Sequence, residues 1–135
     1  MPFKILDHIT VVECATFVTG PYATALLADL GARVIKIESA PDGDPYRYFA
    51  PDPVFSFNFA HLNRNKESLV LDLKAPEGKA ICLELLKKAD VFVENFRPGT
   101  ADRLGIGYDA LRKMNPKLVY CSISAFGQTG PYAEK

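Results

Sequence analysis

Residues 90–99 read DVFVENFRPG, and this stretch decides how the rest of the chain is interpreted. The β-branched and aromatic run at residues 91–93 predicts a buried strand, which a proline and a glycine at positions 98 and 99 prevent from continuing. Asn95, Phe96 and Arg97 then follow the carboxyl end of the strand, where open α/β sheets bind their ligands. An amide, a ring and a guanidinium suit a nucleotide-like ligand that carries phosphate. A plain strand-to-helix turn with a surface arginine fits the same residues.

Strand and helix patterns alternate on both sides of this stretch. We expect strands at residues 9–14, 33–38, 68–73, 90–94 and 118–123, and helices at residues 22–30, 55–62, 76–86, 100–104 and 108–114. Gly20 and Pro21 predict a turn before the first helix, and residues 39–54, with four prolines, predict a long loop of the kind that is often functional. This order favours an α/β fold with a Rossmann-like parallel sheet and flanking helices.

The last predicted strand is not followed by a helical pattern. A parallel sheet normally has helices on both faces, so we expect one face of this strand to be bare. We therefore expect residues 1–135 to be one piece of a longer, incomplete fold, or a partner to cover this face.

Composition excludes several classes of function. Sixteen basic and sixteen acidic side chains cancel, so no global field recruits nucleic acid or an anionic membrane. No apolar run approaches the roughly 18 residues of a membrane span. Three widely spaced cysteines, Cys14, Cys82 and Cys121, are typical of a cytoplasmic protein with reduced thiols rather than a disulfide or zinc framework.

Common catalytic and metal-binding patterns are absent from the sequence. It has neither GxGxxG nor GxxxxGK[ST], and its two histidines, His8 and His61, are isolated, which predicts no metal site. Cationic and amide groups do gather at the predicted turns, and they make an anionic ligand site plausible: Asn63, Arg64, Asn65, Lys66, Lys74, Asn95, Arg97 and Arg103.

Three long segments, taken in order, carry a resemblance to a known family. They are VVECATFVTGPYATALLADLGARVIKIE (11–38), LNRNKESLVLDLKAPEGK (62–79) and ADVFVENFRPGTADRLGIGYDALRKMNPKLVYCSISAFGQTGPY (89–132). They resemble the N-terminal portion of the family III CoA-transferases, a group that includes formyl-CoA transferase, carnitine-related CoA-transferases and the α-methylacyl-CoA racemases. The resemblance covers nearly the whole chain.

The resemblance implies a Rossmann-like large domain joined to a smaller one, in a homodimer of interlocked subunits. It implies coenzyme A, bound as an acyl-CoA substrate without a metal, and a carboxylic acid as the second substrate. The CoA-contacting positions that it implies are Val18, Thr19, Leu71, Asp72, Leu73, Lys74, Asn95, Phe96, Arg97 and Arg103. Ser39 departs from the pattern, because several members have an arginine there, and this weakens one expected contact with CoA.

The implied reaction moves CoA from an acyl-CoA thioester to the acid. An aspartate attacks the thioester and forms a mixed anhydride, which divides one difficult step into easier ones. In the family this aspartate lies beyond the position of Lys135, so we expect no catalytic residue in residues 1–135 and no transfer by these residues alone. Two alternatives stay open: an isomerase of the racemase type, and a truncated non-catalytic chain that binds CoA or only takes part in assembly.

Overall fold

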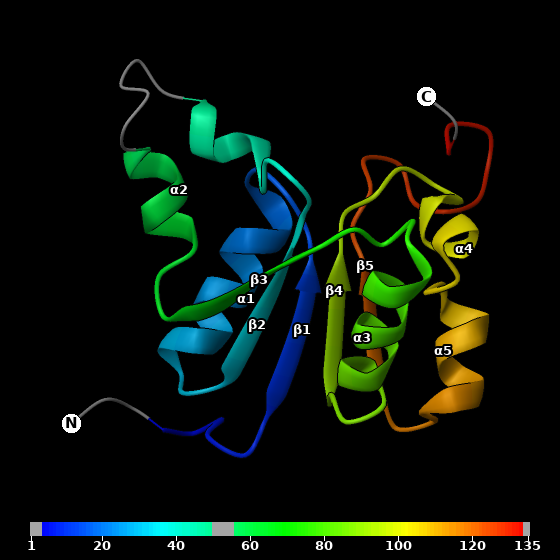
Figure 1. The fold of residues 1–135 in the computed structure, drawn as a ribbon, viewed down its shortest axis with the longest axis horizontal. Coiled ribbons are helices and arrows are strands. Elements are labelled where there is room, and N and C mark those ends of the chain that lie inside the picture. The colour runs from blue at the N-terminus through cyan, green and yellow to red at the C-terminus, as the bar shows by residue number, and fades with distance from the viewer. Residues whose placement is uncertain (1–3, 50–55, 134–135) are drawn as a thin grey trace.

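Five parallel strands form one sheet in the computed structural model, which describes residues 4–49 and 56–133 (Figure 1). The strands are β1 (Thr10–Cys14), β2 (Arg33–Ser39), β3 (Lys66–Leu71), β4 (Val91–Glu94) and β5 (Val119–Ser122). Their order is β3-β2-β1-β4-β5, and every neighbouring pair is parallel. The predicted α/β class with a Rossmann-like sheet is confirmed.

Helices cover both faces of the sheet because alternate strand residues are apolar on each side. On one face, Val11, Val34 and Val93 pack with Ala28 of α1 (Thr19–Asp29). On the other face, the apolar strand residues pack against α3 (Pro76–Leu86), α4 (Thr100–Leu104) and α5 (Tyr108–Met114). Two shorter helices, η1 (Pro45–Tyr48) and α2 (Phe57–Leu62), lie between β2 and β3 along the chain.

The first helix and β3 start two or more residues away from the predicted position, and several other boundaries differ by a single residue. The first helix begins at Thr19 rather than at residue 22, because a proline is tolerated in a first turn, where backbone N–H groups have no partner within the helix. Strand β3 runs two residues earlier than expected, since Lys66 already pairs with Val34 of β2. Asp72, Leu73 and Lys74 therefore lie in the loop after β3.

The predicted loop at residues 39–54 contains η1 in its described part. Residues 50–54 of that loop, and the first residue of the helix predicted at residues 55–62, lie outside the described residues. The described part of that helix is α2.

One face of β5 is open, as the sequence predicts. Tyr120 packs into the core beside α5, whereas Val119 is 60% exposed and Cys121 is also exposed. Within residues 4–49 and 56–133, no helix is long and apolar enough to cross a membrane.

Candidate functional site

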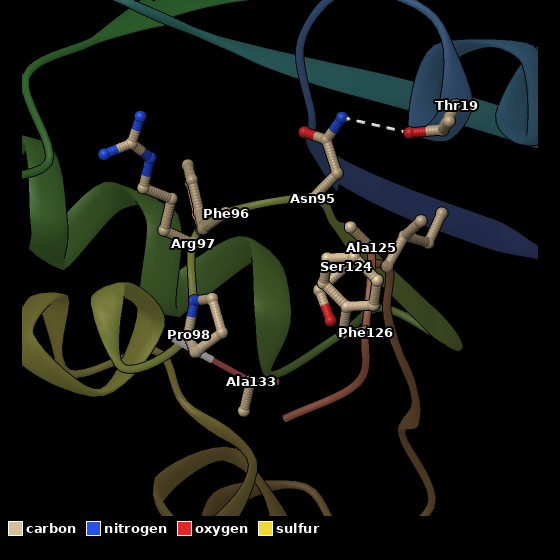
Figure 2. A pocket seen from close by; sticks show the side chains of 10 residues that line it. Thr19, Asn95, Phe96, Arg97, Pro98, Ser124, Ala125, Phe126 and Ala133 are labelled. Carbon is tan, nitrogen blue, oxygen red and sulfur yellow. Dashed lines mark hydrogen bonds between the residues drawn. The ribbon is translucent and has the colours of Figure 1, made fainter. Parts of the chain in front are cut away.

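The loops that follow β1 and β4 meet at the carboxyl edge of the sheet, where the strand order reverses. The side chain of Asn95 joins them. Its Oδ1 accepts the Thr16 N–H at 2.9 Å, and its Nδ2 donates to the Thr16 carbonyl at 2.8 Å. The same Nδ2 donates to the Thr19 hydroxyl at 3.2 Å (Figure 2). The amide that the sequence assigns to a ligand is thus engaged within the chain.

A first hollow of about 360 Å³ lies beside this junction (Figure 2). Its walls come from the first residue of α1, the loop after β4 and the segment after β5. The lining residues are Thr19, Asn95, Phe96, Arg97, Pro98, Ile123, Ser124, Ala125, Phe126 and Ala133. Two parts of the chain predicted from sequence, Thr19 and residues 95–97, therefore do come together.

A second hollow of about 300 Å³ lies between the ends of β2 and β3 and the ring of Phe96. Leu71 and Leu73 give it apolar walls, and Lys74 lines it with an exposed ammonium side chain. Asp72 also lines it, but its Oδ1 accepts the Lys74 N–H at 2.9 Å and so braces the loop. Apolar walls with a cation beside them suit a ligand that is part ring and part anion.

The three predicted phosphate-binding cations line different but adjoining hollows. Lys74 lines the second hollow, and Arg97 lines the first and a third of about 470 Å³. Arg103 lines a fourth of about 570 Å³. Phe96 is shared by the first and second hollows, and Pro98 by the first and fourth. Among the described residues, neither Lys74 nor Arg97 forms an ion pair.

Val18 is the predicted site residue that lines none of these four hollows. It is the N-cap residue of α1 and is 46% exposed. Gly20, two residues later, is buried, and a Cβ added to it would collide with the Cβ of Ala15. The close approach of the helix to the loop after β1 therefore requires glycine at this position.

A buried ionic cluster beneath the site was missed by the sequence reasoning. The Lys36 ammonium lies 2.9 Å from Glu13 Oε1 and 2.9 Å from Asp44 Oδ2, and all three side chains are at most 1% exposed. It also donates to the Ala15 carbonyl at 2.7 Å. A second ammonium, that of Lys66, lies 2.8 Å from Glu13 Oε2. Burial lowers the pKa of Lys66 to about 8, and the nearby Glu13 partly offsets that effect.

Another buried carboxylate, that of Glu38, fixes the segment that carries η1. Burial by itself would raise the pKa of Glu38. Hydrogen bonds from Arg47, at 2.6 and 2.7 Å, from Ser68 at 2.7 Å, and from the Asp44 N–H at 2.9 Å, lower that pKa to about 2. Glu38 lines the second hollow but is fully engaged as a structural anion.

The polar turn at residues 63–66 is used to hold elements together. Arg64 forms an ion pair with Asp29, and Asn65 donates to the same carboxylate at 2.9 Å. Asn63 donates to the Phe59 carbonyl at 2.9 Å. None of the four turn residues lines the four hollows described above, so the contribution of this turn to an anion site stays a prediction.

The cysteine nearest the site is not an activated nucleophile. Cys14 lines the second hollow, but a hydrogen bond with Cys82 and then burial raise the pKa of its thiol. Over the part of the chain that the structure describes, no three His, Cys, Asp or Glu side chains are grouped as metal ligands.

Comparisons with known proteins identify the family. Residues 6–135 match the model of CoA-transferase family III. The chain is 50% identical over 130 residues to an acetyl-CoA:oxalate CoA-transferase of Acetobacter aceti, covering 94% of this chain and 33% of that protein. It is 46% identical over 137 residues to a succinate–glutarate CoA-transferase of Agrobacterium fabrum, covering 96% of this chain and 34% of that protein.

A solved structure agrees with these matches. The crystal structure of a CAIB/BAIF family protein from Brucella suis superposes with a TM-score of 0.91 at 43% identity, covering 98% of this chain and 36% of that one. The chain spans about a third of the length of the curated relatives it matches. The extent of the family match, together with the shared fold, shows that this chain belongs to CoA-transferase family III.

Proposed function

We propose that residues 1–135 bind the CoA portion of an acyl-CoA in an enzyme that passes CoA from this thioester to a carboxylic acid. Family membership and the transferase names of the relatives support the reaction class. One observation carries the assignment of the site: an apolar hollow at the carboxyl edge of the sheet adjoins exposed cations that have no ion-pair partner among the described residues.

The chemistry of CoA divides among the residues of this edge. Leu71, Leu73 and Phe96 offer apolar surface for the adenine or the pantetheine arm, and Val18 and Thr19 offer the backbone at the start of α1. Three cations are proposed to meet its phosphates: Lys74, Arg97 and Arg103. Asp72 would act through the loop that it braces.

We assign no nucleophile within the described residues. The carboxylates of the second hollow already have partners, since Asp72 accepts the Lys74 N–H and Glu38 is paired with Arg47. Following the family resemblance, the attacking carboxylate of the proposed transfer is assigned to a part of the enzyme outside residues 1–135. A homodimer in the cytoplasm belongs to the same proposal, supported by the resemblance and the composition.

Calorimetric titration of the chain with CoA tests the binding site. Lys74→Ala and Arg97→Ala should each weaken binding at least about 10-fold, because each removes a charge-assisted contact with phosphate. Lys117→Ala is the matched control, since Lys117 is exposed at the opposite edge of the sheet, before β5 begins. Equal losses in all three variants, or no binding by the unaltered chain, would contradict the proposal.

The racemase alternative predicts a different reaction of the acyl group. A racemase removes and returns the proton on the α-carbon of the acyl group. Deuterium from the solvent would therefore replace this proton in an acyl-CoA, without any acceptor acid. The transferase proposal predicts no such incorporation, and it predicts exchange of CoA once an acid is added. The names of the relatives favour the transfer.

A further inference from the structure

Asn95 uses every amide hydrogen on its own chain. Its Nδ2 donates to the Thr16 carbonyl and to the Thr19 hydroxyl, and its Oδ1 accepts the Thr16 N–H. The orientation of the amide follows from its neighbours, because a backbone N–H can only donate and a backbone carbonyl can only accept. The pair of bonds to Thr16 continues the pairing of β1 with β4 beyond Cys14 and Glu94, where the strands end.

Side chains on the β2 side of β1 hydrogen-bond the two peptide groups that flank Thr16, opposite the β4 side from which Asn95 comes. The Lys36 ammonium donates to the Ala15 carbonyl at 2.7 Å, and Asp44 Oδ1 accepts the Phe17 N–H at 3.3 Å. Lys36 and Asp44 are almost fully buried and are paired with each other. Three consecutive residues after β1 thus have backbone groups bound by side chains from β2, from the loop before η1 and from the loop after β4.

These contacts surround a strained residue. Phe17 has a φ of 62°, in the left-handed region that bulky side chains avoid. Such a conformation persists where the surrounding structure over-determines it, and it is concentrated at ligand-binding and active sites. The residue that follows the strained one, Val18, caps the helix whose first residue, Thr19, lines the first hollow.

We propose that Asn95 is a positioning residue, whose amide sets the shape of the loop after β1 before any ligand binds, rather than a group that reads the ligand. Asp44 and Lys36 help to fix the same loop by hydrogen bonds from its other side. The part of this inference that concerns CoA affinity rests on the proposed function, whereas the part that concerns the loop does not.

Amide hydrogen exchange, followed residue by residue by NMR in the ligand-free chain, tests the role directly. Asn95→Ala should speed exchange of the Thr16 N–H at least about 10-fold, because that donor loses its acceptor. Asn95→Asp keeps an acceptor for this N–H, so the Thr16 amide should stay slow. The same two variants are titrated with CoA, and Asn95→Ala should weaken binding about 10-fold or more.

Asn115→Ala is the matched control, since the Asn115 side-chain amide also donates to backbone, to the carbonyls of Leu86 at 3.1 Å and Ala89 at 2.9 Å. It should leave both the exchange of Thr16 and the CoA affinity within about 2-fold of the unaltered chain. Unchanged exchange at Thr16 in Asn95→Ala would overturn the inference, whether CoA binding falls or not. Failure of the unaltered chain to bind CoA would instead overturn the proposed function, and the exchange measurement would still decide the role of Asn95. If Asn95→Ala does not fold, fast exchange of Thr16 in folded Asn95→Asp overturns the inference and slow exchange supports it.

Discussion

Replacing Arg47 by alanine should destabilise the protein by about 2 kcal/mol near neutral pH. The lowering of the Glu38 pKa from 4.5 to about 2 corresponds to a net stabilisation of the ionised carboxylate of about 3 kcal/mol, which remains after its partners have offset the penalty of burial. Hydrogen bonds from Ser68 and from the Asp44 N–H supply part of this stabilisation. Water also screens the Arg47 side chain, which is 38% exposed, so the loss expected in the variant is smaller than the whole. The Arg47 guanidinium also lies over the Phe59 ring, 3.9 Å from the ring centroid, and loss of this contact adds a smaller destabilisation.

Arg33→Ala is the matched control because Arg33 forms the same two-bond pair with Glu67, at 2.7 and 2.9 Å, on the surface. Its cost should stay below about 1 kcal/mol. The measurement is urea unfolding followed by circular dichroism, near pH 7 and again near pH 3.

The effect of Arg47→Ala should shrink in acid. A carboxyl whose pKa is lower in the folded state stabilises fully above its ordinary value of 4.5, and this stabilisation disappears as the pH falls through about 2. The reasoning is refuted if the two arginine variants lose the same stability near pH 7. It is also refuted if the loss in Arg47→Ala is as large near pH 3 as near pH 7.

Two further predictions concern the sheet and its loops. Gly78→Ala should lower the unfolding free energy by about 1–3 kcal/mol, because the added Cβ would collide with the backbone carbonyl of Asp72. This loss should outweigh the higher helix propensity of alanine. Urea unfolding that showed an unchanged or more stable variant would contradict this. The unfolding free energy should also rise with pH between about 8 and 10, because the buried Lys66, with a pKa of about 8 against an ordinary 10.5, loses its proton in the folded state first. Lys66→Met should flatten this rise, and an unchanged slope in the variant would refute the assignment. The difference between the two slopes is the quantity to compare, because Cys14 near pH 9 and Tyr120 above pH 10, whose pKa values are raised, act in the opposite sense in both proteins.

The arrangement of the sheet follows from sequence patterns that are local. β-branched runs mark the strands, and Gly31 follows the helix that links the first two, so the element order and the α/β class can be predicted from them. The boundary of β3 could not be predicted, because Lys66 belongs to the strand through its pairing with Val34 of β2, which lies far away in sequence, and its ammonium is held by the equally distant Glu13. Local hydropathy does not contain that information.

The site was predicted less completely than the fold. Phe96 and Lys74 do line one hollow, as a strand-end argument suggests. The sequence cannot show where an amide at a strand end points, so it predicts a ligand contact for Asn95 but not the hydrogen bonds that this amide forms with Thr16. A usable signal for the buried cluster did exist, since Glu13 is the sole charge among the apolar residues 11–15.

The paired charges of β1 and β2 also restrict how the two strands can align. Glu13 lies opposite Lys36 in the observed alignment. A slip of two residues would keep every apolar side chain on its proper face, so hydrophobicity alone would penalise it weakly. In one direction such a slip places Glu13 opposite Val34, and in the other it places two carboxylates, Glu13 and Glu38, against each other without water. The buried ion pair between Glu13 and Lys36 thus favours the observed register of β1 and β2 over registers shifted by two residues.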